Sequence, residues 1–229
     1  MHSFPYIDIH THQSRAENSI VTVRNLYPGE DIPSFNGRNF FSVGLHPWKI
    51  KSPRENNDQL EMMEDALELD HVIFLGECGL DKLADTNFEE QMRVFEAQVF
   101  MAEEYNIPLI IHCVKAYNEI IEVHKRNHPS VPWIFHGYNA NLQVSKQLME
   151  RNMLFSFGTI LFKSNAKAID SFKFLPSEKI FFETDNSEKN IETVYRKGAF
   201  VKGIKTEELK EQVWENFNRI ENISFNQSE

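Results

Sequence analysis

The sequence of 229 residues predicts an α/β fold, a (β/α)8 TIM-like barrel, and three observations lead to this prediction. Eight short apolar runs rich in Ile, Val and Phe have the length of strands that are buried on both faces. Amphipathic stretches with helical spacing follow several of these runs, as in parallel βα units. No linker, repeat or low-complexity tract divides the chain, so we expect one barrel domain over residues 1–229.

Strand-like and helix-like segments alternate from one end of the chain to the other. The predicted strands are Tyr6–Ile9, Ser19–Val23, Asn39–Leu45, His71–Leu75, Pro108–Ile111, Val131–Phe135, Met153–Phe157 and Lys179–Phe182. The predicted helices are Gln59–Leu69, Phe88–Tyr105, Ile120–His124, Leu142–Leu148, Ala166–Phe172 and Glu207–Ile220. An open flavodoxin-like sheet is the alternative fold, but it normally needs fewer strands in a chain of this length.

Two local signals refine this scheme. The segment Asn25–Arg38 between the second and third predicted strands contains two prolines and two glycines. These residues disfavour a helix, so we expect a loop in its place and a distorted barrel. Thr86 and Glu89 have the spacing of a capping box and predict the start of the helix over Phe88–Tyr105.

The charge balance limits the kinds of partner that the chain can bind. It carries 34 Asp and Glu against 24 Lys and Arg, a formal net charge of −10. Tight, sequence-independent wrapping of duplex DNA needs a basic face and is therefore disfavoured. The two cysteines exclude a disulfide scaffold. With no signal peptide or apolar run of about 20 residues, we expect a cytoplasmic protein without a membrane or an obligate protein partner.

Polar residues of the types that bind metals stand at the ends of most predicted strands. Residues two apart in a strand face the same side, so His10 and His12 are expected to project together. The carboxyl ends of all strands meet at one mouth of a barrel. The mouth therefore gathers four imidazoles and two carboxylates, from His10, His12, Glu77, His112, His136 and Asp185.

Imidazole and carboxylate ligands suit Zn²⁺, Mn²⁺ or Fe²⁺ and not a thiolate site. Six ligands exceed the need of one tetrahedral ion. Two ions about 3.5–4 Å apart, bridged by a carboxylate, fit the set better. Glu183 lies two residues before Asp185 and is expected to orient a ligating imidazole.

These motifs together resemble those of the TatD family of metal-dependent hydrolases, the TatD-type deoxyribonucleases of the amidohydrolase-like superfamily. The resemblance extends over nearly the whole chain. It rests on five segments, Asp8–His12, Val43–Pro47, Gly76–Asp81, Ile107–His112 and Glu183–Asp185, together with His136 and Ser156–Gly158. Val114-Lys115 and Gly137-Tyr138 depart from the family's usual residues after His112 and His136.

The resemblance implies a distorted TIM barrel with two divalent metal ions (Zn, Mn or Mg) and metal-dependent cleavage of DNA. By matching position, His10, His12 and Asp185 hold one ion. His112 and His136 hold the other, and Glu77 bridges the two.

From these residues we expect a phosphodiesterase or deoxyribonuclease that cleaves DNA strands or ends with a metal-activated water. Asp185 is the candidate general base, beside the catalytic ligand Glu77. His46 and Lys115 are candidate substrate contacts. Trp48 is interpreted as a core or loop anchor, with stacking on a base as the alternative. An amidohydrolase acting on a small amide, lactone or ester is an alternative, and a non-catalytic metal-binding descendant is another.

Overall fold

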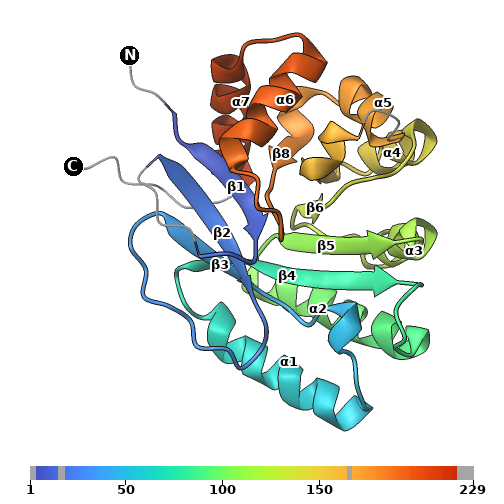
Figure 1. Ribbon diagram of the computed structural model, residues 1–229. Helices are drawn as coiled ribbons and strands as arrows, with labels where there is room; N and C mark the ends of the chain where they lie inside the picture. Colours follow the sequence, from blue (N-terminus) through green and yellow to red (C-terminus); the bar gives the residue numbers. More distant parts are fainter. Residues whose placement is uncertain (1–3, 15–18, 164–166, 221–229) are drawn as a thin grey trace.

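The computed structural model describes residues 4–14, 19–163 and 167–220. Eight parallel strands form one sheet in which every strand pairs with its neighbours in sequence order (Figure 1). The strands are β1 (Tyr6–Thr11), β2 (Ile20–Leu26), β3 (Asn39–Val43), β4 (Val72–Asp81), β5 (Leu109–Val114), β6 (Trp133–Phe135), β7 (Leu154–Phe157) and β8 (Ile180–Phe182). Each overlaps a predicted strand. β4 continues beyond the predicted end at Leu75 and includes Glu77.

Contacts between the first and last strands close the sheet into a barrel. Thr11 at the end of β1 forms a parallel bridge with Asp185, three residues after β8 ends. The backbone N–H of Asp185 donates to the carbonyl of His10 at 3.0 Å. The buried Asp8 carboxylate accepts the Thr184 N–H at 2.9 Å and its hydroxyl at 2.6 Å. This closure confirms the TIM-like barrel and excludes the open flavodoxin-like alternative.

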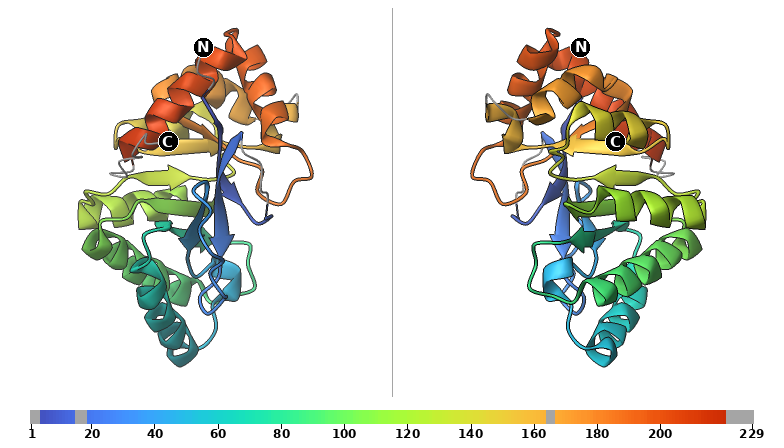
Figure 2. Two further views of the ribbon diagram at one scale, coloured as in Figure 1. Left: turned by 90° about the vertical axis from the view of Figure 1, so that its left-hand side faces the viewer. Right: turned by 90° about the vertical axis from the view of Figure 1, so that its right-hand side faces the viewer.

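Helices cover the outside of the strands (Figure 2). In the described part of the chain they are α1 (Pro53–Leu67), α2 (Phe88–Tyr105), α3 (Tyr117–Asn127), α4 (Leu142–Met149), α5 (Lys167–Phe174), α6 (Ile191–Lys202) and α7 (Thr206–Ile220). Three short 3-10 helices are η1 (Pro47–Lys49), η2 (Thr159–Phe162) and η3 (Ser177–Lys179). No helix lies between β2 and β3, where residues 27–38 are all described, so the predicted loop is confirmed. The predicted helix start at Ala166 lies outside the described residues.

The structure corrects the sequence analysis at two helices. The predicted capping box at Thr86 is wrong, because α2 is capped one residue later by Asn87, whose side chain accepts the Glu90 N–H. The Thr86 hydroxyl instead donates to the carbonyl of Pro47 at 2.9 Å. The helix α6 was not predicted. Its Tyr195 is fully buried, and the phenol hydroxyl exchanges hydrogen bonds with the backbone of Ile7 in β1.

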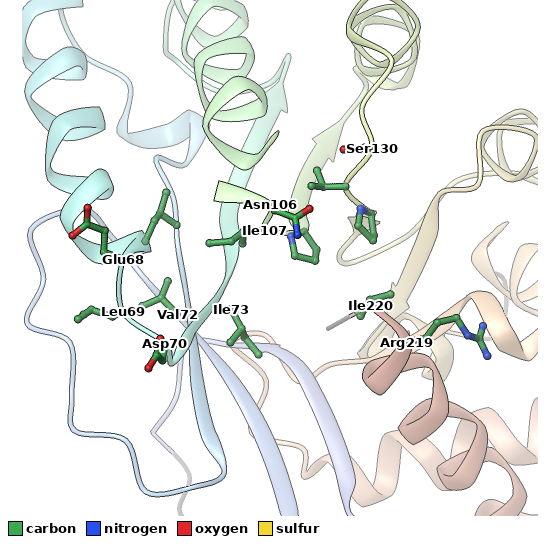
Figure 3. A pocket seen from close by; sticks show the side chains of 14 residues that line it. Glu68, Leu69, Asp70, Val72, Ile73, Asn106, Ile107, Ser130, Arg219 and Ile220 are labelled. Carbon is green, nitrogen blue, oxygen red and sulfur yellow. The ribbon is translucent and has the colours of Figure 1, made fainter. Parts of the chain in front are cut away.

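A pocket of about 430 Å³ lies at the end of the barrel where strands begin (Figure 3). It is lined by Val72 and Ile73 at the start of β4 and by residues that precede β5 and β6. The six predicted metal ligands lie at the opposite end, and none of them lines this pocket. Among the described residues, no helix is both long and apolar enough to cross a membrane.

Candidate metal centre

The strand ends bring the six predicted ligands together around Glu77. His10 is in β1, Glu77 in β4 and His112 in β5. His12 and His136 directly follow β1 and β6, and Asp185 lies three residues after the end of β8. His10 and Glu77 are almost fully buried, and the Asp185 side chain is 44% exposed. The cluster is therefore buried on the side of His10 and Glu77 and open to solvent on the side of Asp185.

The two oxygens of Glu77 face two different sets of imidazoles. On one side, Oε2 lies 3.5 Å from Nε2 of His10 and 3.4 Å from Nε2 of His12. On the other, Oε1 lies 2.8 Å from Nδ1 of His112 and 2.6 Å from Nε2 of His136. Asp185 belongs to the first set, since its Oδ1 lies 3.5 Å from Nε2 of His12.

The backbone around Glu77 is held by residues of two neighbouring strands. The Asn25 side chain in β2 accepts the Glu77 N–H at 2.5 Å and the Ser42 hydroxyl at 3.1 Å. Gly44 and Gly76 approach so closely that a Cβ on Gly44 would lie 2.5 Å from the Gly76 Cα. Sequence reasoning missed Asn25, for which the only signal was an amide at the end of an apolar strand.

A hydrogen bond from the backbone orients the His46 ring and fixes its tautomer. The Trp48 N–H donates to its Nδ1 at 3.1 Å, so in the neutral ring the proton is on Nε2. That Nε2 lies 3.2 Å from Glu77 Oε1. Burial lowers the pKa of His46, even though Glu77 favours its protonated form. His46 is therefore a neutral hydrogen-bond donor toward Glu77, and it reaches the same oxygen as His112 and His136.

His112 and His136 each meet a second carboxylate on the nitrogen that faces away from Glu77. Nε2 of His112 lies 3.4 Å from Asp81, and Nδ1 of His136 lies 3.7 Å from the buried Glu183. A carboxylate behind a histidine is the usual means of orienting a ligating imidazole. Burial disfavours the charged form of His136, but Glu77 and Glu183 outweigh it and raise the pKa of His136 well above its ordinary value.

The first set fits a metal ion by its chemistry and its distances. Both ring nitrogens of His10 are buried without a hydrogen-bond partner. Four ligands at about 2.0–2.2 Å in a tetrahedron stand about 3.3–3.6 Å from one another. The separations of His10 and His12 from Glu77 Oε2, and of His12 from Asp185 Oδ1, are 3.4–3.5 Å, whereas His10 Nε2 lies 3.9 Å from Asp185 Oδ1. Three of these four separations match a tetrahedral cation, and no hydrogen bond from a described residue occupies the His10 nitrogens.

The remaining predicted site residue, Lys115, lies at the end of β5 beyond His112. It is exposed, and its φ of 55° is in the left-handed region that only a few per cent of non-glycine residues adopt. Its side chain lines a groove next to the cluster and forms no ion pair with any described residue. Lys115 therefore borders the mouth and does not enter the imidazole cluster.

Comparison with known sequences identifies metal-dependent hydrolases. The uncharacterized metal-dependent hydrolase MJ1582 of Methanocaldococcus jannaschii is 25% identical over 190 residues, which cover 77% of this chain and 73% of that protein. The uncharacterized metal-dependent hydrolase YabD of Bacillus subtilis is 28% identical over 149 residues, 64% of this chain and 58% of YabD. The human 3′–5′ RNA nuclease TATDN2 is 30% identical over 150 residues, 63% of this chain and 19% of that protein. The chain thus spans less than two thirds of the length of YabD and of TATDN2.

A solved structure has the same fold. The TatD homologue YjjV of Escherichia coli matches with a TM-score of 0.82 at 20% identity, over 95% of this chain and 98% of that one. The sequence model of the TatD related DNase family matches residues 30–222, most of the barrel. The strand order, the clustered histidines and carboxylates and this match together place the chain in the TatD family of metal-dependent hydrolases.

Proposed function

We propose that this chain is a divalent-metal-dependent phosphodiesterase that cleaves single-stranded DNA or the ends of DNA strands. The observation that carries the proposal is the position of Glu77, whose two oxygens face two separate sets of imidazoles at 2.6–3.5 Å. A carboxylate in this position suits a bridge between two ions. The family's description as TatD related DNases and the RNA nuclease named among the relatives support a nucleic-acid substrate.

Each proposed ligand has a place in this arrangement. His10, His12 and Asp185 would hold one ion, and His112 and His136 the other, with Glu77 shared between them. Two divalent ions bound there would polarise the phosphoryl oxygens and make a hydroxide available near neutral pH. Their positive charge would also make the mouth attractive to a phosphate although the chain carries a net charge of −10. Zn, Mn and Mg all suit this ligand set in part, and availability decides among them as much as affinity.

The chain's own groups would position the substrate and move its protons. Asp185 is the most exposed carboxylate of the cluster, with 44% of its side chain open to solvent, so it would accept the proton of the attacking water. His46 directs its Nε2–H to Glu77 Oε1 in this structure, and it would turn this donor to a phosphoryl or leaving-group oxygen when Glu77 is engaged by the ions. Lys115 at the rim would contact a neighbouring phosphate as a point charge.

A combined metal and cleavage assay tests this proposal. The purified protein is analysed for metal content and then incubated with end-labelled single-stranded DNA, single-stranded RNA and a panel of amides, lactones and esters, with Mn²⁺, Mg²⁺ or Zn²⁺. We expect metal-dependent shortening of the DNA and no turnover of the acyl substrates. Stoichiometric metal without cleavage of any strand would overturn the proposal, and turnover of an acyl substrate would favour the amidohydrolase alternative.

Two variants connect the activity to the site. Asp185→Asn is expected to lower the cleavage rate by about 10²–10⁴-fold, the usual contribution of a positioned general base. Glu188→Gln is the matched control, since Glu188 is an exposed carboxylate in the same loop, and it should cleave like the unmodified protein. An equal residual rate in all three proteins would identify a contaminating nuclease.

A further inference from the structure

A groove of about 890 Å³ opens beside the metal centre, along the ends of β5 and β6. Its inner wall includes Cys113 and Gly137, which directly follow His112 and His136 in sequence. Three exposed lysines line it, Lys115, Lys163 and Lys167, whereas no Asp or Glu does. None of the three forms an ion pair with a described residue. On a chain with a net charge of −10, this groove is a local positive surface.

A second cavity, of about 560 Å³, borders the same end of β5 from the other side. Its lining combines Trp48, Leu83 and Val114 with the carboxylates of Asp81 and Asp85. Trp48 and Leu83 are each 63% exposed, unusually high values for large apolar side chains. The Trp48 ring is nevertheless held in place, because its Nε1–H donates to Asp81 at 2.6 Å and its centroid lies 6.0 Å from that of His112. It is a fixed aromatic surface at the mouth.

The two cavities meet at the end of β5. Val114 lines both, and Lys115 follows it on the side of the lysine groove. Figure 1 shows β4 and β5 side by side with their carboxyl ends on the same side of the barrel, next to α3. His112, two residues before Val114, contacts Glu77 at 2.8 Å. An aromatic surface and a cationic groove therefore flank one metal ligand.

We propose that these surfaces form an extended binding site for single-stranded nucleic acid, with one base stacked on Trp48 and adjacent phosphates along Lys163 and Lys167. This inference rests on the proposed phosphodiesterase activity for its substrate class and extends it beyond the scissile bond. Aromatic surfaces combined with a cationic groove are the usual means of binding single strands without sequence readout. Neither element suits a small amide or lactone, which has no chain of phosphates to fill the groove.

The lysine groove is tested by binding, independently of cleavage. Fluorescence anisotropy measures the affinity of the purified protein for a labelled hexathymidylate with cleavage-resistant phosphorothioate linkages at several salt concentrations. The double variant Lys163→Glu/Lys167→Glu should weaken binding at least tenfold. It should also flatten the slope of log K against log[salt] by about 1.4, that is about 0.7 for each of two lost phosphate contacts.

The matched control is Lys125→Glu/Lys205→Glu, which reverses two exposed lysines that line neither cavity. It should bind like the unmodified protein. Equal losses of affinity in the groove and control variants would overturn the proposed binding role of the groove, because such losses would reflect the overall charge of the protein alone. Equally tight binding of a polyglutamate peptide of the same charge would overturn the assignment to nucleic acid.

The stacking surface is tested by Trp48→Ala and Trp48→Phe with hexathymidylate and with an abasic oligomer of the same length. Loss of one stacked base should weaken hexathymidylate binding by about 5- to 150-fold in Trp48→Ala. Trp48→Phe removes the hydrogen bond to Asp81 but keeps a ring, so it should retain most of the affinity. A Phe variant as weak as the Ala variant, or an equal loss with the abasic oligomer, would overturn stacking.

The two proposals fail in distinguishable ways. If no strand is cleaved with any metal but the groove and Trp48 variants weaken binding as expected, the phosphodiesterase proposal fails and the binding site stands. If strands are cleaved but these variants leave affinity and KM unchanged, the binding site fails and the phosphodiesterase stands.

Discussion

Asp81 places its Oδ2 3.4 Å from Nε2 of His112, on the side of the ring opposite Glu77. The same oxygen accepts the Trp48 indole N–H at 2.6 Å, and Oδ1 accepts the Leu83 N–H at 2.8 Å. Because these two N–H groups fix the carboxylate, Asp81 can hold the His112 proton on Nε2 and leave Nδ1 toward Glu77. A carboxylate at the end of β4 thus sets the orientation of a proposed metal ligand.

Asp81→Asn is therefore expected to weaken metal binding by about 10–100-fold, the usual effect of losing the partner of a ligating histidine. Titration against a competing chelator measures this affinity. Asp85→Asn, which changes an exposed carboxylate in the segment between β4 and α2, serves as the control. Unchanged affinity in Asp81→Asn would contradict the orienting role of this contact.

Asp8→Ala should destabilise the barrel at its closure. The change removes two hydrogen bonds to a buried charged acceptor and leaves the Thr184 N–H unpaired, so the free energy of unfolding should fall by about 3 kcal/mol. Urea denaturation measures the loss. Thr184→Ser keeps both donors and should lose less than about 1.5 kcal/mol. A small effect of Asp8→Ala would show that other contacts hold β8 against β1.

Gly44→Ala should disturb both folding and the site, since its Cβ would lie 2.5 Å from the Gly76 backbone next to Glu77. We expect a loss of about 3 kcal/mol in the free energy of unfolding and weaker metal binding. Gly37→Ala serves as the control for steric overlap. Gly37 has a φ of +88°, but no atom lies within 4 Å of a Cβ added there. It should lose about 1–2 kcal/mol, from the backbone conformation alone, and bind metal normally.

The stability of the protein should depend on acid pH through Glu103 in α2, which is not one of the proposed metal ligands. Burial opposes its ionisation, but hydrogen bonds from Ser130 and Val131 outweigh that effect and lower the pKa of Glu103 below its ordinary value. Because the pKa of Glu103 is lower in the folded than in the unfolded protein, its ionised carboxylate stabilises the fold above the unfolded pKa, ordinarily 4.5. This stabilisation is lost as the pH falls through the pKa of the folded protein.

Glu103→Ala should accordingly reduce the free energy of unfolding by about 1–3 kcal/mol at neutral pH. The difference from the unmodified protein should shrink as the pH falls below 4.5, because the protonated carboxyl no longer accepts these bonds fully. Denaturation at several pH values tests both statements. Glu104→Ala changes the next residue, which is exposed, and should show no such pH dependence. A constant difference across this range would refute the linkage.

The barrel could be predicted because its signal is repeated eight times along the chain. Each strand is a short apolar run, and each proposed ligand stands at or shortly after the end of such a run in the sequence, from His10 to Asp185. Parallel topology then determines that these ends meet. The missing helix after β2 was also predictable, since two prolines and two glycines within Asn25–Arg38 oppose it.

Features that depend on tertiary contacts could not be predicted. α6 depends on burying Tyr195 against β1, a contact that spans 188 positions in sequence. The cap of α2 is Asn87 and not Thr86, because the Thr86 hydroxyl contacts Pro47 in another segment. Asn25 supports Glu77 across strands, and sequence spacing carries no sign of that pairing.

The closure of β8 onto β1 also determines when the contacts of the proposed metal centre can form during synthesis of the chain. Asp8 contacts Thr184, and His10 and His12 lie beside Asp185, so these contacts form only after β8 and the residues that follow it have been synthesised. A nascent chain that ends before β8 has an unpaired edge at β1 and lacks the last proposed ligand. The full set of proposed ligands therefore comes together only in a chain whose β8 has closed onto β1.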